Sequence, residues 1–124
     1  MFPWKRFQLR STVGKPPYSK WMLRRRRYAD VISRQLDLFV REHAGLIADC
    51  EAAERAYDRA ERDEAEERYG DYMDLVETGT ELLAELRDNF ARTLDEDASE
   101  EYEADFNRAV VKRFPRFALQ IEDT

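Results

Sequence analysis

Apolar and small residues recur in steps of three and four along most of the chain, which is the spacing of one face of an α-helix. One such stripe runs through residues 28–60, a second through 69–94 and a third through 102–114. The third stripe ends at Pro115, which biases the residue before it out of the helical region. The pattern predicts an all-α fold with helix 1 at about 20–60, helix 2 at about 69–94 and helix 3 at about 98–114.

The first two stripes are out of phase with each other. Ala60 and Tyr69 are nine residues apart, which would place them on opposite sides of one straight helix. We therefore expect a tip at 61–68 and an antiparallel hairpin of helices 1 and 2. No Gly, Pro or Asn lies in this stretch before Gly70, so one continuous helix is the alternative interpretation.

Local signals mark the other boundaries. Ser19 is a reasonable N-cap for a helix that begins near Lys20, and Asp97 with Glu100 resembles a capping box at the start of helix 3. Beyond Pro115, apolar residues alternate with others, as they do in an extended segment. This alternation predicts either a short extended tail that lies on the helices or an exposed peptide that docks elsewhere.

Together these elements predict a three-helix bundle from which an antiparallel helical hairpin projects as a coiled-coil-like stalk. An irregular basic and aromatic N-terminal arm at 1–19 precedes a single helical domain at 20–114, and a C-terminal tail occupies 115–124. The apolar stripes of the predicted stalk contain Tyr57, Tyr69 and Tyr72. These side chains could pack between the two helices of the hairpin or at the interface of a homodimer.

Charge is divided sharply between the two ends of the chain. Residues 1–28 carry nine Lys/Arg and no Asp/Glu, whereas residues 29–124 carry twelve Lys/Arg and twenty-seven Asp/Glu. The net charges are thus +9 and −15. In the basic part, aromatic residues are interleaved with the cations, and we expect a polyanion or partner to bind at Trp4, Lys5, Arg6, Phe7, Arg10, Lys15, Lys20, Trp21, Arg24, Arg25, Arg26 and Arg27.

A polyanion is the expected partner of this arm, with RNA, a ribonucleoprotein or DNA as the candidates. Cations that neutralise phosphates release counterions, and aromatic rings stack on unpaired bases. An acidic protein surface is an alternative, which would make the chain a structural or regulatory subunit. A third possibility is an anionic membrane surface, where Lys/Arg and Trp residues also bind.

The sequence offers no catalytic, metal or cofactor site. His43 and Cys50 are seven residues apart on one helical face, but structural zinc requires four ligands and catalytic zinc three. A di-iron bundle requires paired Glu-x-x-His motifs, and position 40 is Val40 rather than Glu. We find no phosphate-binding loop and no nucleophile with a base, so a non-enzymatic interaction or accessory protein without a cofactor is expected.

Cys50 is the single cysteine, which rules out a disulfide within the chain and favours a reducing compartment. No stretch approaches the roughly 20 apolar residues of a membrane span. A cytoplasmic location is therefore expected.

Overall fold

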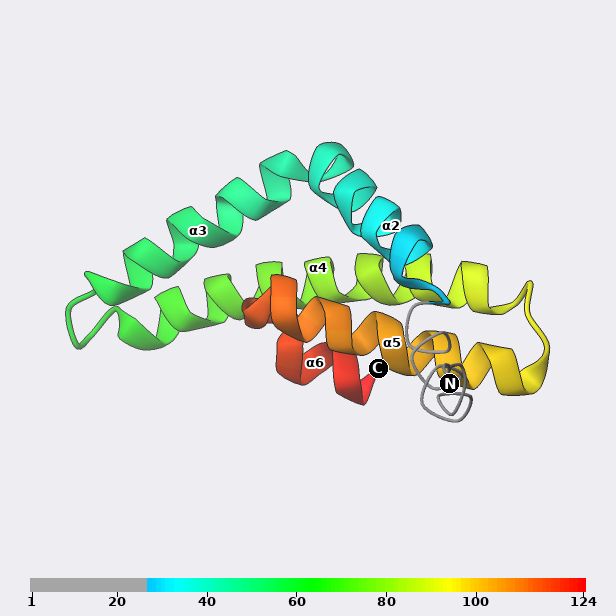
Figure 1. The fold of residues 1–124 in the computed structure, drawn as a ribbon. Coiled ribbons are helices and arrows are strands. Elements are labelled where there is room, and N and C mark those ends of the chain that lie inside the picture. The colour runs from blue at the N-terminus through cyan, green and yellow to red at the C-terminus, as the bar shows by residue number, and fades with distance from the viewer. Residues whose placement is uncertain (1–26) are drawn as a thin grey trace, which may run out of the picture. The chain divides into compact units, whose positions relative to one another are not determined.

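The computed structural model describes residues 27–124, and every regular element in that range is helical (Figure 1). A boundary after Asp30 divides the chain into two units, and nearly all described residues belong to the second, Val31–Thr124. The elements are α2 (Ala29–Glu42), α3 (Ala44–Asp58), α4 (Ala65–Ala91), α5 (Glu96–Arg113), the 3₁₀ turn η1 (Pro115–Phe117) and α6 (Ala118–Asp123). The all-α prediction is confirmed. The expected N-cap at Ser19 and the helix start near Lys20 lie outside the described residues.

A break at His43 divides the expected helix 1, which we predicted as one helix, into α2 and α3 (Figure 1). The φ and ψ angles of His43 are −125° and 32°, outside the helical region. Its amide still donates to the carbonyl of Phe39 at 2.9 Å, and its carbonyl accepts from Ile47 at 3.0 Å. The chain therefore changes direction without leaving these two backbone groups unpaired.

Residues 59–64 turn the chain between α3 and α4, so the alternative of one continuous helix is wrong. The two helices pack against each other and run in opposite directions (Figure 1). Near the turn, the rings of Tyr57 and Tyr69 lie with their centroids 5.3 Å apart, one from each helix. This contact closes the free end of the helix pair. Helix α4 begins at Ala65, earlier than the predicted 69.

Helix α5 begins two residues earlier than predicted because a different aspartate caps it. Asp95 is the N-cap, and its carboxylate accepts a hydrogen bond from the amide of Ala98 at 2.9 Å. Asp97, the predicted cap, lies in the first turn, where the helix dipole stabilises its negative charge. At the other end, Phe114 leaves the helical region with φ −129° and ψ 71° because Pro115 follows it.

The C-terminal segment is helical rather than extended, which corrects our prediction for this tail. Phe117 and Ile121, four residues apart, are both buried, as successive residues on one helical face. Leu119, expected on the same side as these two, is 82% exposed. The segment therefore lies on the other helices through one face of a single short helix.

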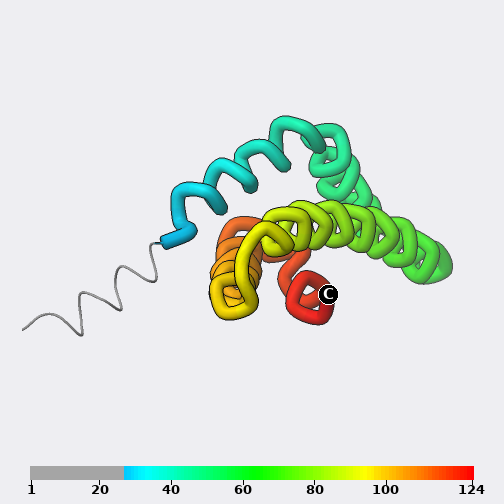
Figure 2. The backbone as a smooth tube through the Cα atoms, turned by 90° about the vertical axis from the view of Figure 1, so that its right-hand side faces the viewer, coloured from blue at the N-terminus to red at the C-terminus, as the bar shows by residue number. Residues whose placement is uncertain are grey.

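The main apolar core forms where α5, η1 and α6 pack against α4, on one side of the long helix (Figure 2). Its buried side chains come from all four elements: Val76, Leu83, Ala84, Ala91, Ala98, Tyr102, Phe106, Val110, Phe117 and Ile121. Gly79 of α4 belongs to the same region, because a Cβ at this position would lie only 2.5 Å from Cε1 of Phe117. The absence of a side chain at Gly79 thus allows η1 to approach α4 closely.

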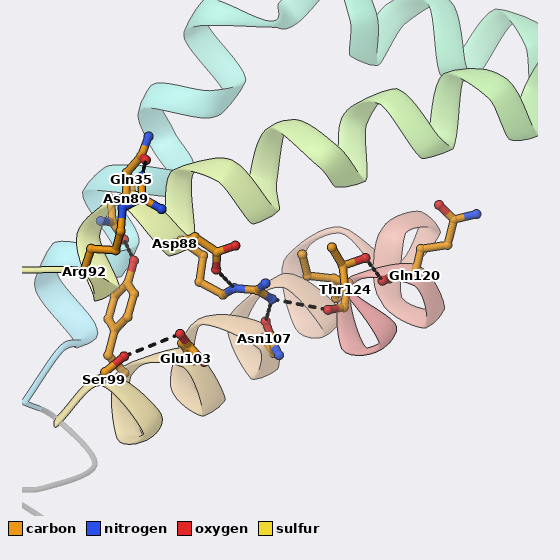
Figure 3. Close-up of polar contacts among 12 residues, drawn as sticks. Gln35, Asp88, Asn89, Arg92, Ser99, Glu103, Asn107, Gln120 and Thr124 are labelled. Carbon is orange, nitrogen blue, oxygen red and sulfur yellow. Dashed lines mark hydrogen bonds and ion pairs between the residues drawn. The ribbon is translucent and has the colours of Figure 1, made fainter. Parts of the chain in front are cut away.

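Arg87 joins α4, α5 and α6 from within this core through hydrogen bonds to Asp88, Asn107 and the carbonyl of Ile121. Figure 3 labels Asp88 on α4 and Asn107 on α5. The side chain is buried, and its guanidinium donates to Asp88 Oδ1 at 2.9 Å and to Asn107 Oδ1 at 2.9 Å. A longer bond of 3.4 Å reaches the main-chain carbonyl of Ile121. A charge removed from water is costly unless it is paired, so these bonds are what make a buried arginine tolerable here.

Between residues 27 and 124, no helix is both long enough and apolar enough to cross a bilayer.

Candidate binding groove

Eleven of the twelve predicted binding residues lie outside the described residues: Trp4, Lys5, Arg6, Phe7, Arg10, Lys15, Lys20, Trp21, Arg24, Arg25 and Arg26. Arg27 is the one that the structure describes. Its side chain is exposed, and the guanidinium carbon lies 5.2 Å from the centroid of the Tyr28 ring, a cation–π distance.

A groove of about 590 Å³ lies among the described residues. It lies where α2, α3, α4 and the α5–η1 corner meet. Apolar side chains from all of these elements line most of it: Val40, Ile47, Tyr72, Phe114, Pro115 and Phe117. Four charged side chains complete the lining: Glu51, Glu54, Arg113 and Arg116.

A cluster of aromatic rings fixes the α5–η1 wall of the groove. Phe39 of α2 packs edge-on against Phe114 and Phe117, with centroid distances of 5.6 and 6.2 Å. Edge-to-face pairs of this kind stabilise by about 0.5–1.5 kcal/mol beyond the area they bury. The corner at Pro115 is what turns both phenylalanines toward α2.

Arg116 bridges this wall to α3. Its guanidinium donates to Glu54 Oε1 at 2.9 Å, while its Nε atom is buried without a hydrogen-bond partner. Burial lowers the pKa of Arg116, but the adjacent Tyr72 hydroxyl and the Glu54 carboxylate raise it, and the net pKa is raised. The raised pKa keeps the arginine charged at neutral pH.

Arg113 lies one turn earlier, on the rim. It donates to Asp37 Oδ1 at 2.7 Å and lies 5.4 Å from the centroid of the Phe114 ring. Both partners of this ion pair are exposed. The groove therefore has an apolar lining, two arginines on its α5–η1 side and two glutamates on its α3 side.

Cys50 lies close to this site but is fully buried. Burial raises the pKa of its thiol, and the positive charge of Arg116 offsets part of that effect. A buried, protonated thiol is a poor nucleophile and a poor metal ligand. His43, the other soft ligand, packs its ring on Phe39 with a centroid distance of 5.2 Å.

Across residues 27–124, no three His, Cys, Asp or Glu side chains are grouped closely enough to hold a metal ion.

The groove is not evident from the sequence because its residues come from five separate elements. The one local signal was Phe114-Pro115-Arg116-Phe117, two aromatic residues and an arginine around a helix-ending proline. We interpreted Pro115 as a helix end and did not expect the residues around it to form a wall.

Comparison with known proteins gives no assignment: no protein-family model, no curated protein and no solved structure matches this chain.

Proposed function

We propose that the chain is a non-enzymatic helical accessory protein that docks through residues 1–27 onto a polyanion, such as RNA, a ribonucleoprotein or DNA. The observation that carries this proposal is the separation of charge. Residues 1–28 carry a net charge of +9, whereas the remainder carries −15. A polyanion would be repelled by the helical part and attracted by the basic segment, so its point of attachment follows from electrostatics.

In this proposal the helical part is a three-helix bundle with a projecting helical hairpin, and it presents the basic segment to the polyanion. Two ion pairs lie at the groove, Arg113 with Asp37 and Arg116 with Glu54. Function in the cytoplasm is part of the same proposal and follows from the single cysteine, Cys50.

The test compares two full-length variants with the same change in net charge. One carries Gln in place of Arg24, Arg25 and Arg26. The control carries Gln in place of Arg55, Arg59 and Arg62, which are exposed on and just after α3. Binding to labelled single-stranded RNA and to duplex DNA is measured by fluorescence anisotropy between about 50 and 200 mM salt.

The native chain and the control should bind with the same steep salt dependence. The first variant should bind more weakly, with a slope of log affinity against log salt smaller by about 2 to 3, as expected when three phosphate contacts are lost. Equal loss in both variants, or binding that salt does not affect, would overturn the proposal. Binding to anionic vesicles in place of nucleic acid would favour a membrane surface.

A second candidate function is the binding of a protein partner, and the groove favours it. An apolar concavity with charged groups at its edges is typical of sites that accept a side chain or helix of a partner. Ile47→Glu would place a charge in its apolar lining. Loss of a stoichiometric partner from a nuclease-treated pull-down, with the helical content unchanged, would support this function; an unchanged partner would contradict it.

A further inference from the structure

A second, smaller concave site, the α2–α4 cleft, lies between those two helices. Its volume is about 150 Å³, and four apolar side chains line it: Leu38, Phe39, Leu82 and Leu86. The polar part of the lining consists of Glu42, His43, Glu85 and Asn89. An apolar cavity of about 150 Å³ can hold a benzene molecule, so the α2–α4 cleft has room for one aromatic ring.

The charges of the α2–α4 cleft are of one sign. Among the described residues that line it, two are carboxylates, Glu42 and Glu85, and none is Lys or Arg. Both glutamates are exposed, and no ion pair within residues 27–124 occupies either of them. The larger groove at Pro115 differs, because its two arginines and two glutamates cancel. The α2–α4 cleft is therefore suited to an aromatic side chain with cations on either side of it.

The segment 1–26 of the same chain, which lies outside the described residues, has this chemistry. It carries eight Lys/Arg and no Asp/Glu, and it contains both tryptophans of the chain, Trp4 and Trp21. Lys20 precedes Trp21, and three arginines follow at 24–26. Residues 27–124 carry thirteen Lys/Arg against twenty-seven Asp/Glu, so the segment is attracted to the helical part of its own chain.

Trp21 is close enough in sequence to reach the α2–α4 cleft. Leu38 and Glu42 follow Ala29 by nine and thirteen positions, which is about 14 to 20 Å along α2. The eight residues from Trp21 to Ala29 can span up to about 26 Å. Trp4 is also within reach, but the longer connection would cost more loop-closure entropy. Trp21 is thus the favoured occupant.

We infer that the α2–α4 cleft holds Trp21 of its own chain when no polyanion is bound. The indole ring enters between Leu38 and Leu86, and the neighbouring Lys and Arg side chains face Glu42 and Glu85. The inference rests on the proposed function, because the segment in the cleft is the one proposed to bind the polyanion. The same cations serve both contacts, so the cleft competes with the polyanion and lowers its affinity.

The covalent connection favours the chain's own segment over that of a second copy. A short link holds a segment at about millimolar effective concentration beside its site. A second copy in a micromolar solution is a thousandfold more dilute, and the net charge of −6 on each whole chain opposes the approach of two copies. Within one chain, a contact of millimolar affinity is therefore enough to occupy the cleft.

Tryptophan fluorescence of the full-length protein tests the inference without nucleic acid, since residues 27–124 contain no tryptophan. Trp4→Phe leaves Trp21 as the single reporter. Its emission should lie at shorter wavelength than in the urea-unfolded chain, and acrylamide, an uncharged quencher, should quench it less. Glu42→Gln combined with Glu85→Gln should shift the emission toward that of the unfolded chain and increase the quenching.

The matched control for this cleft variant is Glu77→Gln combined with Glu81→Gln. These two carboxylates are exposed on α4 and do not line the α2–α4 cleft. The control has the same net charge as the cleft variant and should leave the Trp21 signal unchanged. Far-UV circular dichroism verifies that both proteins are folded.

Affinity for labelled single-stranded RNA provides a second measurement. The cleft variant should bind about twofold to tenfold more tightly than the control, as expected if the cleft holds the segment in about half to nine-tenths of the free molecules. Both proteins carry native residues 1–27, so the difference reports the release of the segment and not a change in its contacts with RNA.

Equal emission and quenching of Trp21 in the cleft variant and the control would overturn the inference. Shielding that increases with protein concentration would also overturn it, because the occupant would then come from a second copy. If the cleft variant and the control bind RNA equally well, the proposed function stands and this inference fails. If Trp21 is shielded by the cleft but the chain binds neither RNA nor DNA, the cleft contact stands and the proposed polyanion function fails.

Discussion

The two halves of α4 are stabilised in different ways. All of its buried residues lie from Val76 onward, where α5, η1 and α6 pack against it. The half before Val76 packs against α3, whose one fully buried side chain is Cys50. One half of this continuous helix is thus buried in the core, and the other half is exposed in the helix pair. Because helices in proteins are stabilised mainly by the apolar side chains they bury, we expect the core half to be the more stable.

Truncation of a large side chain in each half is the strongest test of this comparison. Phe106→Ala removes a fully buried ring and should destabilise the protein by about 3–5 kcal/mol. Tyr57→Ala removes a ring that is exposed and packed on Tyr69, and it should cost no more than about 1.5 kcal/mol. Urea unfolding measures both. Equal losses would show that the helix pair contributes as much as the core.

High pH should destabilise the core half selectively. Burial raises the pKa of Tyr102 to about 12, while a hydrogen bond to Gln35 at 2.7 Å lowers it in part. The unfolded state releases this proton near pH 10, so the contribution is present below pH 10 and is lost as the pH rises toward 12. The loss should be roughly 2–3 kcal/mol across that interval.

Tyr102→Phe separates this effect from other groups that titrate at high pH, such as Cys50. The variant should be less stable at neutral pH because Gln35 loses its donor, but its stability should fall less between pH 10 and 12. If the free energy of unfolding falls equally for the two proteins between pH 10 and 12, the loss does not come from Tyr102.

Two glycines of α4 should respond in opposite directions to the same change. Gly79→Ala forces a methyl group against the Phe117 ring and should destabilise by about 1–3 kcal/mol. A Cβ at Gly70 meets nothing within 4 Å, so Gly70→Ala should stabilise the helix by about 0.5–1 kcal/mol. Thermal melting of the two variants gives the comparison, and the same sign for both would contradict it.

The smallest effect is expected at the exposed ion pair between α2 and α5. Asp37→Asn removes the charge that faces Arg113 and should change the stability by less than about 1 kcal/mol, with the difference shrinking in high salt. A larger or salt-insensitive loss would mean that this pair, and not the aromatic cluster around Phe39, holds α2 in place.

Much of this fold could be predicted from the sequence because the apolar spacing is regular over long stretches. The helical class, the turn before α4 and the end of α5 at Pro115 all followed from that spacing. Helix starts were less predictable, because at α5 two aspartates near residue 95 could serve as the cap. Asp95 and Asp97 differ in which backbone amide they reach, and this depends on the path of the chain.

Two errors have a common physical cause. Phe117, Leu119 and Ile121 fit a period of two, but Phe117 and Ile121 also fit a period of four, and a short run does not distinguish between them. The break at His43 was missed because the apolar stripe continues through it. In both places the apolar spacing alone does not decide the conformation: the ring of Phe117 occupies the space above Gly79, and the ring of His43 packs on Phe39 four residues earlier.

The groove could not be predicted at all, since it depends on where α2 and α3 lie relative to the Pro115 corner. The basic binding site, by contrast, could be predicted without knowledge of the fold, because the prediction rests on the Lys/Arg and aromatic content of residues 1–27.

The bond from Arg87 to Ile121 has a consequence for how this protein can diverge. Arg87 donates a hydrogen bond to the main-chain carbonyl at position 121, which every amino acid supplies. At position 107 it donates to the side chain of Asn107, which few amino acids could replace. Substitutions at 87 and 107 should therefore be correlated among related chains, whereas position 121 is free to vary among apolar residues that fill the same space. A contact map inferred from correlated substitutions would therefore recover the contact between positions 87 and 107 and overlook the contact between positions 87 and 121.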